Sequence, residues 1–257
     1  IRADQAAGLS GATECDAGGG LGRIDAVVAG DRVQHGPIRG DPVHHHRAAA
    51  QGGDVPGRIG GGGGDAAAAV GIGAINPGDG ILSLGTSGVL FVVTDKLVTK
   101  PERVLNAMCH AVPHRWHVMG VTLSAASALS WFASIIGRSH EVSKLITEVE
   151  ICVRDSSRRA HAPIFIPYLT GERTPHNDPK AHGIFSGLRA EHDAVPMAYA
   201  VMEGVGFCFA DHFDILTDAK IALKNCLLVG GGARSDFWGQ MLADILDFPL
   251  DLPEGAE

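Results

Sequence analysis

The chain has 257 residues, of which 45% are hydrophobic, and a formal net charge of -8 at pH 7 with histidine neutral. This length suits one large domain or two modest ones, and the acidic balance argues against a nucleic-acid partner, which usually needs a basic surface. No apolar run reaches the roughly 18 residues of a membrane-spanning helix, and five scattered cysteines without a Cys-x-x-Cys pair indicate reduced thiols, so we expect a cytoplasmic protein without membrane contacts.

Residues 1–61 form an atypical Gly/Ala/Arg-rich segment, and we expect a boundary between residues 61 and 62. Seventeen of the 35 glycines fall within residues 1–64, and no Phe, Trp, Tyr or Lys precedes Phe91. Such a composition buries little apolar surface, so the segment is predicted to be disordered. A GC-rich coding sequence read in a wrong frame would give the same mixture, and resequencing the DNA would distinguish the two.

The regular part of the chain opens with a glycine-rich turn that carries a lone carboxylate. Asp65 follows four glycines and precedes a helix that the pattern predicts for residues 66–74. This residue is equally well explained as an N-cap or as a base that accepts the proton of a substrate hydroxyl. The two roles are compatible.

A second glycine turn lies between two apolar runs that predict strands at residues 81–84 and 89–94. It consists of Gly85, Thr86, Ser87 and Gly88. The turn is either an ordinary connection of a hairpin or a nest in which hydroxyls and backbone N–H groups bind phosphate oxygens.

The following segments alternate between strand and helix patterns. We predict strands at 118–121, 163–166 and 226–229, helices at 123–136, 142–149, 195–213 and 237–246, and a loop at 167–183. Gly137 is expected to end the first of these helices. Gly204 and Gly206 each cost about 1 kcal/mol against Ala inside a helix, which predicts close packing there. Strands followed by helices, with glycine turns at strand ends, indicate a layered α/β fold.

Two polar groups of residues have an ordinary and a functional interpretation. His110, His114 and His117 with Cys109 match no standard zinc spacing, so structural or surface histidines are favoured over a metal site, and we predict no metal ligands. His44–His46 could bind metal adventitiously. The charged run from Gly171 to Asn177 is either a solvated connection with an internal Glu172–Arg173 network, or a lid or interdomain latch.

A third glycine turn, Gly230–Ser235, follows the strand predicted at 226–229. It is either a plain strand-to-helix connection or a flat surface for a nucleotide, with Ser235 capping the next helix. The turn lacks the GxGxxG spacing of dinucleotide-binding folds, and the chain has no GKS or GKT of a Walker A loop.

Taken in order, these motifs resemble the FGGY carbohydrate kinases and, within them, the xylulokinases. The blocks are GGGD, LSLGTSG, CHAVPHRWHVMGVTLSAASALSWF, FIPYLTGERTPHNDPKAHGIFSGL, MEGVGF and GGGARS. The resemblance covers residues 62–257 and implies the second, nucleotide-binding domain of an actin-like ATPase (ribonuclease H-like) fold. The first domain is expected to be largely missing, and the second truncated at its C-terminal end.

The resemblance also implies roles for individual residues. Asp65 matches the catalytic base, and Ala66 occupies the position where many relatives have an Asn that contacts the sugar. Two further sets match nucleotide-binding turns: Gly85, Thr86, Ser87 and Gly88 near the phosphates, and Gly231, Gly232, Ala233 and Arg234 near adenosine. The implied reaction is Mg-ATP-dependent phosphorylation of D-xylulose to its 5-phosphate by a cytoplasmic enzyme that forms a homodimer.

Three departures leave alternatives open: Ala66 in place of Asn, the absence of first-domain motifs in residues 1–61, and the end of the chain at residues 251–257. The chain is therefore either part of a pentulose kinase or a non-catalytic nucleotide-binding remnant. An FGGY kinase for another sugar or polyol, such as ribulose, is a further alternative, and a metal-binding protein is a distant one.

Overall fold

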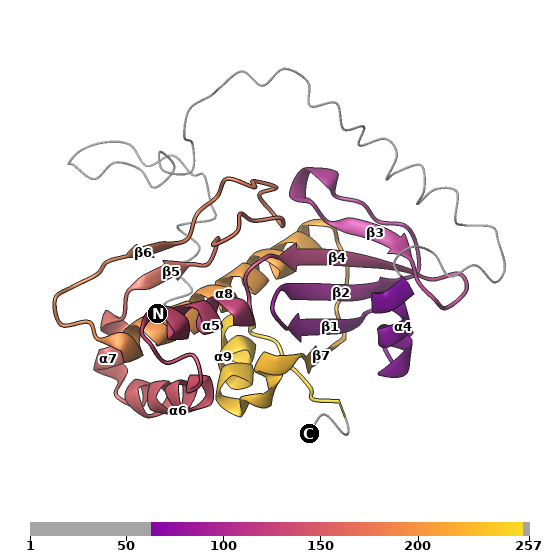
Figure 1. Cartoon of the computed structure of the whole chain (residues 1–257). Helices are drawn as coiled ribbons and strands as arrows, with labels where there is room; N and C mark the ends of the chain where they lie inside the picture. Colours follow the sequence, from indigo (N-terminus) through magenta and orange to yellow (C-terminus); the bar gives the residue numbers. More distant parts are fainter. Residues whose placement is uncertain (1–62, 254–257) are drawn as a thin grey trace, which may run out of the picture. The chain divides into compact units, whose positions relative to one another are not determined.

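The computed structural model describes residues 63–253, except for the side chains of residues 63–65 and 156–158 (Figure 1). The predictions for residues 1–61, their boundary before residue 62 and His44–His46 lie outside the described residues. Within the described part, no helix is both long enough and apolar enough to cross a membrane.

A five-stranded sheet in the order β3-β4-β2-β1-β7 forms the centre of the described domain. Its strands are β1 (Asp79–Leu84), β2 (Gly88–Thr94), β3 (Asn106–Cys109), β4 (Trp116–Thr122) and β7 (Asn225–Val229). All neighbours are antiparallel except β1 and β7, which run parallel. The predicted hairpin is confirmed, since Leu84 pairs with Gly88 across the intervening turn.

Both faces of this sheet are covered, and the apolar residues of each strand alternate between them. Leu82, Leu90 and Val92 belong to the main core, which includes residues of α8 (Ala194–Asp218) and α9 (Asp236–Leu246). Ile81, Phe91 and Val93 belong to a smaller core on the other face with Ala69 of α4 (Gly63–Gly71). Because the strands are buried on both sides, they appear in the sequence as continuous apolar runs.

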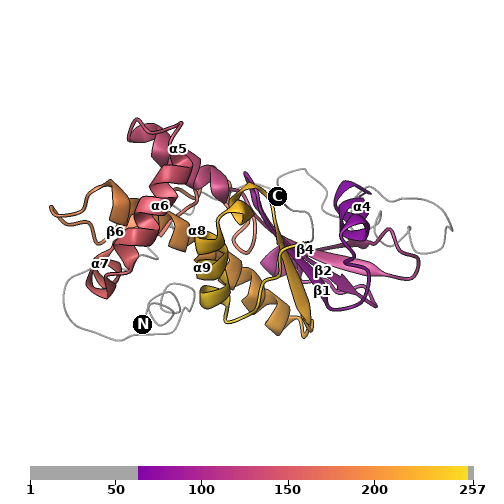
Figure 2. The same ribbon diagram turned by 90° about the horizontal axis from the view of Figure 1, so that it is seen from below.

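Helix α8 packs against more of the other described elements than any other helix does. Three helices gather near one end of it: α5 (Ala126–Ile135), α6 (Val142–Val153) and α7 (Ser156–His161). Helix α4 lies apart from this group (Figures 1 and 2). A small antiparallel sheet of β5 (Ile164–Ile166) and β6 (Ile184–Ser186) also contacts α8.

The close packing predicted at Gly204 and Gly206 is confirmed. A Cβ atom at Gly204 would lie 2.2 Å from the carbonyl oxygen of Phe165 in β5, and one at Gly206 would lie 2.5 Å from Cδ1 of Ile245 in α9. The two glycines therefore let α8 approach the small sheet on one side and α9 on the other.

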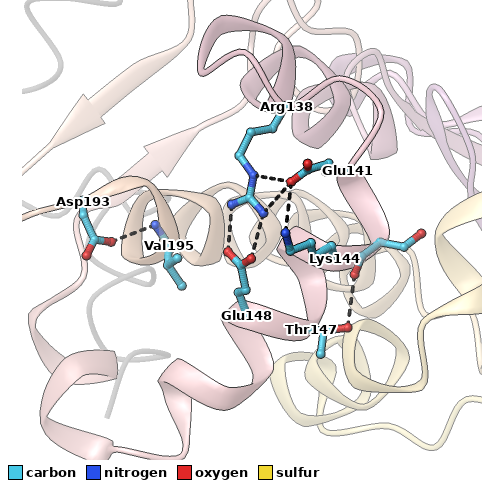
Figure 3. A network of polar contacts seen from close by, with 8 residues as sticks. Arg138, Glu141, Lys144, Thr147, Glu148, Asp193 and Val195 are labelled. Carbon is cyan, nitrogen blue, oxygen red and sulfur yellow. Dashed lines mark hydrogen bonds and ion pairs between the residues drawn. The ribbon is translucent and has the colours of Figure 1, made fainter.

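The helix ends follow the sequence signals closely. Gly137 has φ +74°, and the N–H of Arg138 donates to the carbonyl of Ala133 at 2.7 Å, which is the hydrogen bond of a Schellman stop. Arg138 then binds Glu148 of α6 through two hydrogen bonds of 2.8 Å and also contacts Glu141 (Figure 3). This bidentate pair ties the α5–α6 connection to α6.

Several boundaries and short elements differ from the predictions. Helix α4 begins at Gly63 and ends at Gly71, because Gly73 adopts φ +84°; α5 starts at Ala126, and α8 extends to Asp218. β3, α7 and β6 were not predicted, since they are too short for periodicity to identify.

Candidate functional site

Two glycine turns that are far apart in the sequence meet at one edge of the sheet. Strands β1 and β7 run parallel with Ser83 opposite Val229, so their carboxyl ends lie side by side. The turn Gly85–Ser87 follows β1, and Gly230 with the 3-10 helix η2 (Gly231–Arg234) follows β7. Ligands of open α/β sheets bind in crevices beyond the carboxyl ends of strands.

The contact between these turns requires glycine. Gly230 has φ +97°, and a Cβ atom there would lie 2.8 Å from the carbonyl carbon and oxygen of Leu84. At Gly232 a Cβ would lie 2.5 Å from Cγ of Leu84. At Gly231, in contrast, a Cβ would meet no atom within 4 Å, so this residue borders open space.

The Gly85–Ser87 turn uses its carbonyl groups to bind the start of α5. The N–H groups of Ala125 and Ala126 donate to Thr86 and Gly85 at 3.0 and 2.8 Å. Ser127 donates to the Thr86 carbonyl through its hydroxyl at 2.7 Å and its N–H at 3.3 Å. The sequence alone does not single out Ser127 as a partner of this turn, because nothing about one serine in a predicted helix points to a turn some forty residues earlier.

The donors of the same turn are unoccupied within the described chain. Outside the β-ladder, no described residue accepts a hydrogen bond from the N–H groups or hydroxyls of Thr86 and Ser87. Thr86 is exposed and Ser87 half-buried. Backbone N–H groups and hydroxyls arranged in this way can bind phosphate oxygens.

Gly88 has a packing reason for being glycine. It is buried at the start of β2, where a Cβ would lie 2.6 Å from both Phe209 Cζ and Thr122 Cγ2. Its predicted contact with the nucleotide remains a prediction.

The connection from β7 into α9 is short and locally braced. The N–H of Ala233 donates to Gly230 at 3.1 Å, and the predicted cap is confirmed by the Trp238 N–H donating to Ser235 Oγ at 3.1 Å. Arg234 is exposed and forms no ion pair with any described residue, so its guanidinium is free to meet an anionic ligand.

The predicted catalytic residue Asp65 lies in the first turn of α4 rather than before the helix. The structure does not describe the side chain of Asp65, so its role as a base stays a prediction. Ala66 is 2% exposed, and Ala69 packs beneath the sheet.

The charged loop is neither a solvated connection nor a free lid. Glu172 is 2% exposed, and its carboxylate accepts hydrogen bonds from Thr122 Oγ1 at 2.5 Å, Leu123 N–H at 3.0 Å and Arg173 N–H at 2.7 Å. Burial raises the pKa of Glu172, and these hydrogen bonds oppose that rise. Arg173 therefore binds Glu172 through its backbone N–H. Its side chain is exposed and does not form the predicted internal ion pair with Glu172.

A second residue of the loop strengthens this attachment to β4. The hydroxyl of Thr174 accepts from the Val121 N–H at 3.0 Å and donates to the Val104 carbonyl at 3.2 Å. The N–H of Thr174 donates to the Val121 carbonyl at 3.0 Å. The loop is therefore latched to the end of β4 within the domain.

Two of these three histidines, His110 and His117, pack against Phe91 of the smaller core. His117 lies on β4 and stacks on Phe91 with ring centroids 4.4 Å apart. His110 meets both rings edge-on, whereas His114 is exposed at a positive φ of 59°. In the part of the chain that the structure covers, no group of three or more His, Cys, Asp or Glu residues could hold a metal ion.

Comparisons with known proteins agree with this geometry. The model of the FGGY family of carbohydrate kinases, C-terminal domain, matches residues 80–257. A xylulose kinase of Escherichia coli strain K12 is 46% identical over 189 residues, which are 74% of this chain and 38% of that protein. One of Klebsiella pneumoniae is 45% identical over 200 residues, 77% and 40% of the two chains.

A solved structure, described as a xyloylose kinase from Brucella ovis, superposes with a TM-score of 0.67 at 41% identity. The match covers 75% of this chain and 39% of that one. The chain thus spans about two fifths of the length of these relatives. The expected actin-like α/β fold is confirmed.

Proposed function

We propose that this chain, which belongs to the FGGY family of carbohydrate kinases, carries the nucleotide-binding part of an ATP-dependent ketopentose kinase. The observation that carries this proposal is the meeting of the Gly85–Ser87 turn and the Gly230–Arg234 turn beyond the carboxyl ends of β1 and β7. D-Xylulose is the first candidate substrate, because the relatives just compared are described as xylulose kinases.

Each turn has a distinct part in binding Mg-ATP. The free N–H groups and hydroxyls of Thr86 and Ser87 bind phosphate oxygens, and the positive end of α5 behind the turn favours their charge. The open face at Gly231 receives the nucleoside, and Arg234 stands beside it. Magnesium bound to the ATP phosphates would supply charge neutralisation in the transition state.

The transfer itself needs one base and good positioning. The substrate hydroxyl oxygen attacks the γ-phosphorus, the bond from that phosphorus to the bridging oxygen breaks, and ADP leaves. The hydroxyl proton passes to the carboxylate of Asp65. Phosphoryl transfer depends mainly on positioning and electrostatic stabilisation, so a base and two nucleotide-binding turns are the main groups that this part of the kinase would contribute.

The identity of the sugar is the least constrained part of the proposal. Ala66 cannot offer the hydrogen bonds of an amide side chain, which leaves another sugar or polyol, such as ribulose, as an alternative substrate. Because the kinase would consume ATP and a small sugar, we expect it to act in the cytoplasm. We also expect it to assemble as a homodimer.

The deciding experiment measures ADP release by this chain with Mg-ATP, alone and with D-xylulose, ribulose or glycerol. Release that depends on D-xylulose supports the proposal. Binding of ADP without release for any sugar favours the alternative, a non-catalytic nucleotide-binding protein. If the chain shows no ADP binding and no ADP release, the kinase proposal and the nucleotide-binding alternative are both rejected.

A further inference from the structure

The segment that holds the Gly85–Ser87 turn is itself anchored by a buried carboxylate. Glu172 accepts hydrogen bonds from Thr122 Oγ1 at 2.5 Å and Leu123 N–H at 3.0 Å, both at the end of β4. The N–H of Arg173 supplies a third bond at 2.7 Å. Three hydrogen bonds thus converge on one buried carboxyl group, so this anchor is firm.

The same segment also reaches the turn, at both of its ends. Thr122 pairs with Gly88 in the β2–β4 ladder. A few residues later, the N–H groups of Ala125 and Ala126 and the hydroxyl of Ser127 bind the carbonyls of Thr86 and Gly85. Residues 122–127 therefore touch both Glu172 and the turn.

We infer that Glu172 is a positioning residue for the Gly85–Ser87 turn, acting through residues 122–127. The inference rests on the proposed function of that turn. Glu172 fixes where β4 ends, and with it the place of the donors on Ala125, Ala126 and Ser127. These donors turn the carbonyls of Gly85 and Thr86 toward α5, which leaves the N–H groups and hydroxyls of Thr86 and Ser87 for phosphate.

Asp178 provides a matched control on the same loop. Its carboxylate Oδ1 accepts from the Lys180 N–H at 2.8 Å near the surface, and its side chain has no hydrogen bond to β4 among the described residues. Asp178→Asn therefore changes a loop carboxylate without touching residues 122–127.

The coupling is measured first, without ligand, by amide hydrogen exchange of residues 125–127 in the whole chain. Their N–H groups are protected by the bonds to Gly85 and Thr86, so we expect at least tenfold faster exchange in Glu172→Ala. Thr122→Val, which removes one donor and keeps the shape, should give a smaller increase. Exchange in α9 should stay unchanged in these variants, and Asp178→Asn should match the unsubstituted chain throughout.

Ligand affinity is measured next, with ADP and adenosine as probes. We expect the ADP dissociation constant to rise at least tenfold in Glu172→Ala and threefold to tenfold in Thr122→Val and Ser127→Ala. Adenosine affinity should not change, because only the phosphate turn is displaced. Glu172→Gln should stay within threefold, since its amide oxygen still accepts from Leu123 and Arg173.

The outcomes separate the two levels of the argument. Exchange at residues 125–127 that is indifferent to Glu172→Ala and Thr122→Val overturns the inference, as does an equal loss of ADP and adenosine binding. If Glu172→Ala does not fold, Thr122→Val and Ser127→Ala decide alone. Coupling without any ADP binding by the unsubstituted chain rejects the nucleotide function, and the inference falls with it.

Discussion

Gly230 and Gly231 are neighbours with opposite constraints, although the sequence shows them as a uniform glycine run. A Cβ at Gly230 would press on the backbone of Leu84 and Gly85, at a φ of +97° that other residues rarely adopt. A Cβ at Gly231 would meet nothing within 4 Å. The first glycine brings the two turns together, and the second leaves space beside them.

The pair gives a matched test of the site. We expect Gly230→Ala to lower the free energy of unfolding by about 1–3 kcal/mol through strain and displacement of the Gly85 turn, and to weaken ADP binding at least tenfold. Gly231→Ala should leave the free energy of unfolding within about 0.5 kcal/mol of the unsubstituted chain. Urea unfolding and ADP titration measure the two effects; equal stabilities would contradict the steric argument.

Asp65 carries the catalytic part of the proposal. Asp65→Asn keeps the size of the side chain and removes the proton acceptor, so sugar-dependent ADP release should fall to background while ADP affinity stays within twofold. Turnover assays and ADP titration on the same preparation provide the comparison. Equal loss of both would assign Asp65 to the structure of α4 instead.

At the scale of elements, α8 shows how a residue unfavourable to a helix can be required by packing. Gly204 lies where the carbonyl oxygen of Phe165 comes so close that a Cβ would be 2.2 Å away. The periodicity of α8 is visible in the sequence, and its glycines indicate close packing, but the sequence does not say against which element.

Replacing that glycine should reverse the usual preference for alanine in helices. Ala is favoured over Gly by about 1 kcal/mol in a helix interior, yet overpacking of this kind typically costs about 1–3 kcal/mol. We therefore expect Gly204→Ala to lower the thermal midpoint. Gly71→Ala, at the end of α4 where a Cβ meets nothing within 4 Å, should keep or raise it. A stabilised Gly204→Ala chain would show that α8 and β5 are not packed as described.

Short elements and long-range contacts mark where prediction from sequence stopped. The β1–β2 hairpin was predictable because glycine-flanked apolar runs stand out, but β3 and β6 have too few residues for a period to be recognised. Glu172 belongs to a loop of polar and charged residues, which made it look solvated. It is buried because its partners come from Thr122 and Leu123, about fifty positions earlier.

For the whole molecule, buried imidazoles should dominate the response to acid. Burial lowers the pKa of His117 and of His212 from 6.5 to about 4. Between those values the unfolded chain takes up protons that the folded chain refuses, so stability falls as the pH falls, by about 1.4 kcal/mol per pH unit for each histidine. Asp211 acts in the opposite direction, because burial and then the nearby Asp214 raise its pKa to about 6.

Taken together, the two histidines and Asp211 predict that the free energy of unfolding falls by about 2 kcal/mol between pH 6.5 and 5. This net loss is close to the contribution of one histidine. His117→Phe should flatten this dependence, and Asp211→Asn should steepen it toward twice the slope. His140→Gln is the control, because His140 is exposed. Urea unfolding across the pH range measures all four chains, and a slope unchanged by His117→Phe would show that this ring is hydrated.

The sequence by itself determined the alternation of strands and helices and the position of the glycine turns, because glycines between apolar runs are local signals, and the resemblance of its motifs indicated the family. Only the tertiary structure decided that the two turns touch, that the charged loop is latched to β4 and that His110 and His117 pack in a core. Those features depend on which strands become neighbours. The parallel pairing of β1 with β7 joins residues some 146 positions apart, and the patterns of local sequence do not record such a pairing.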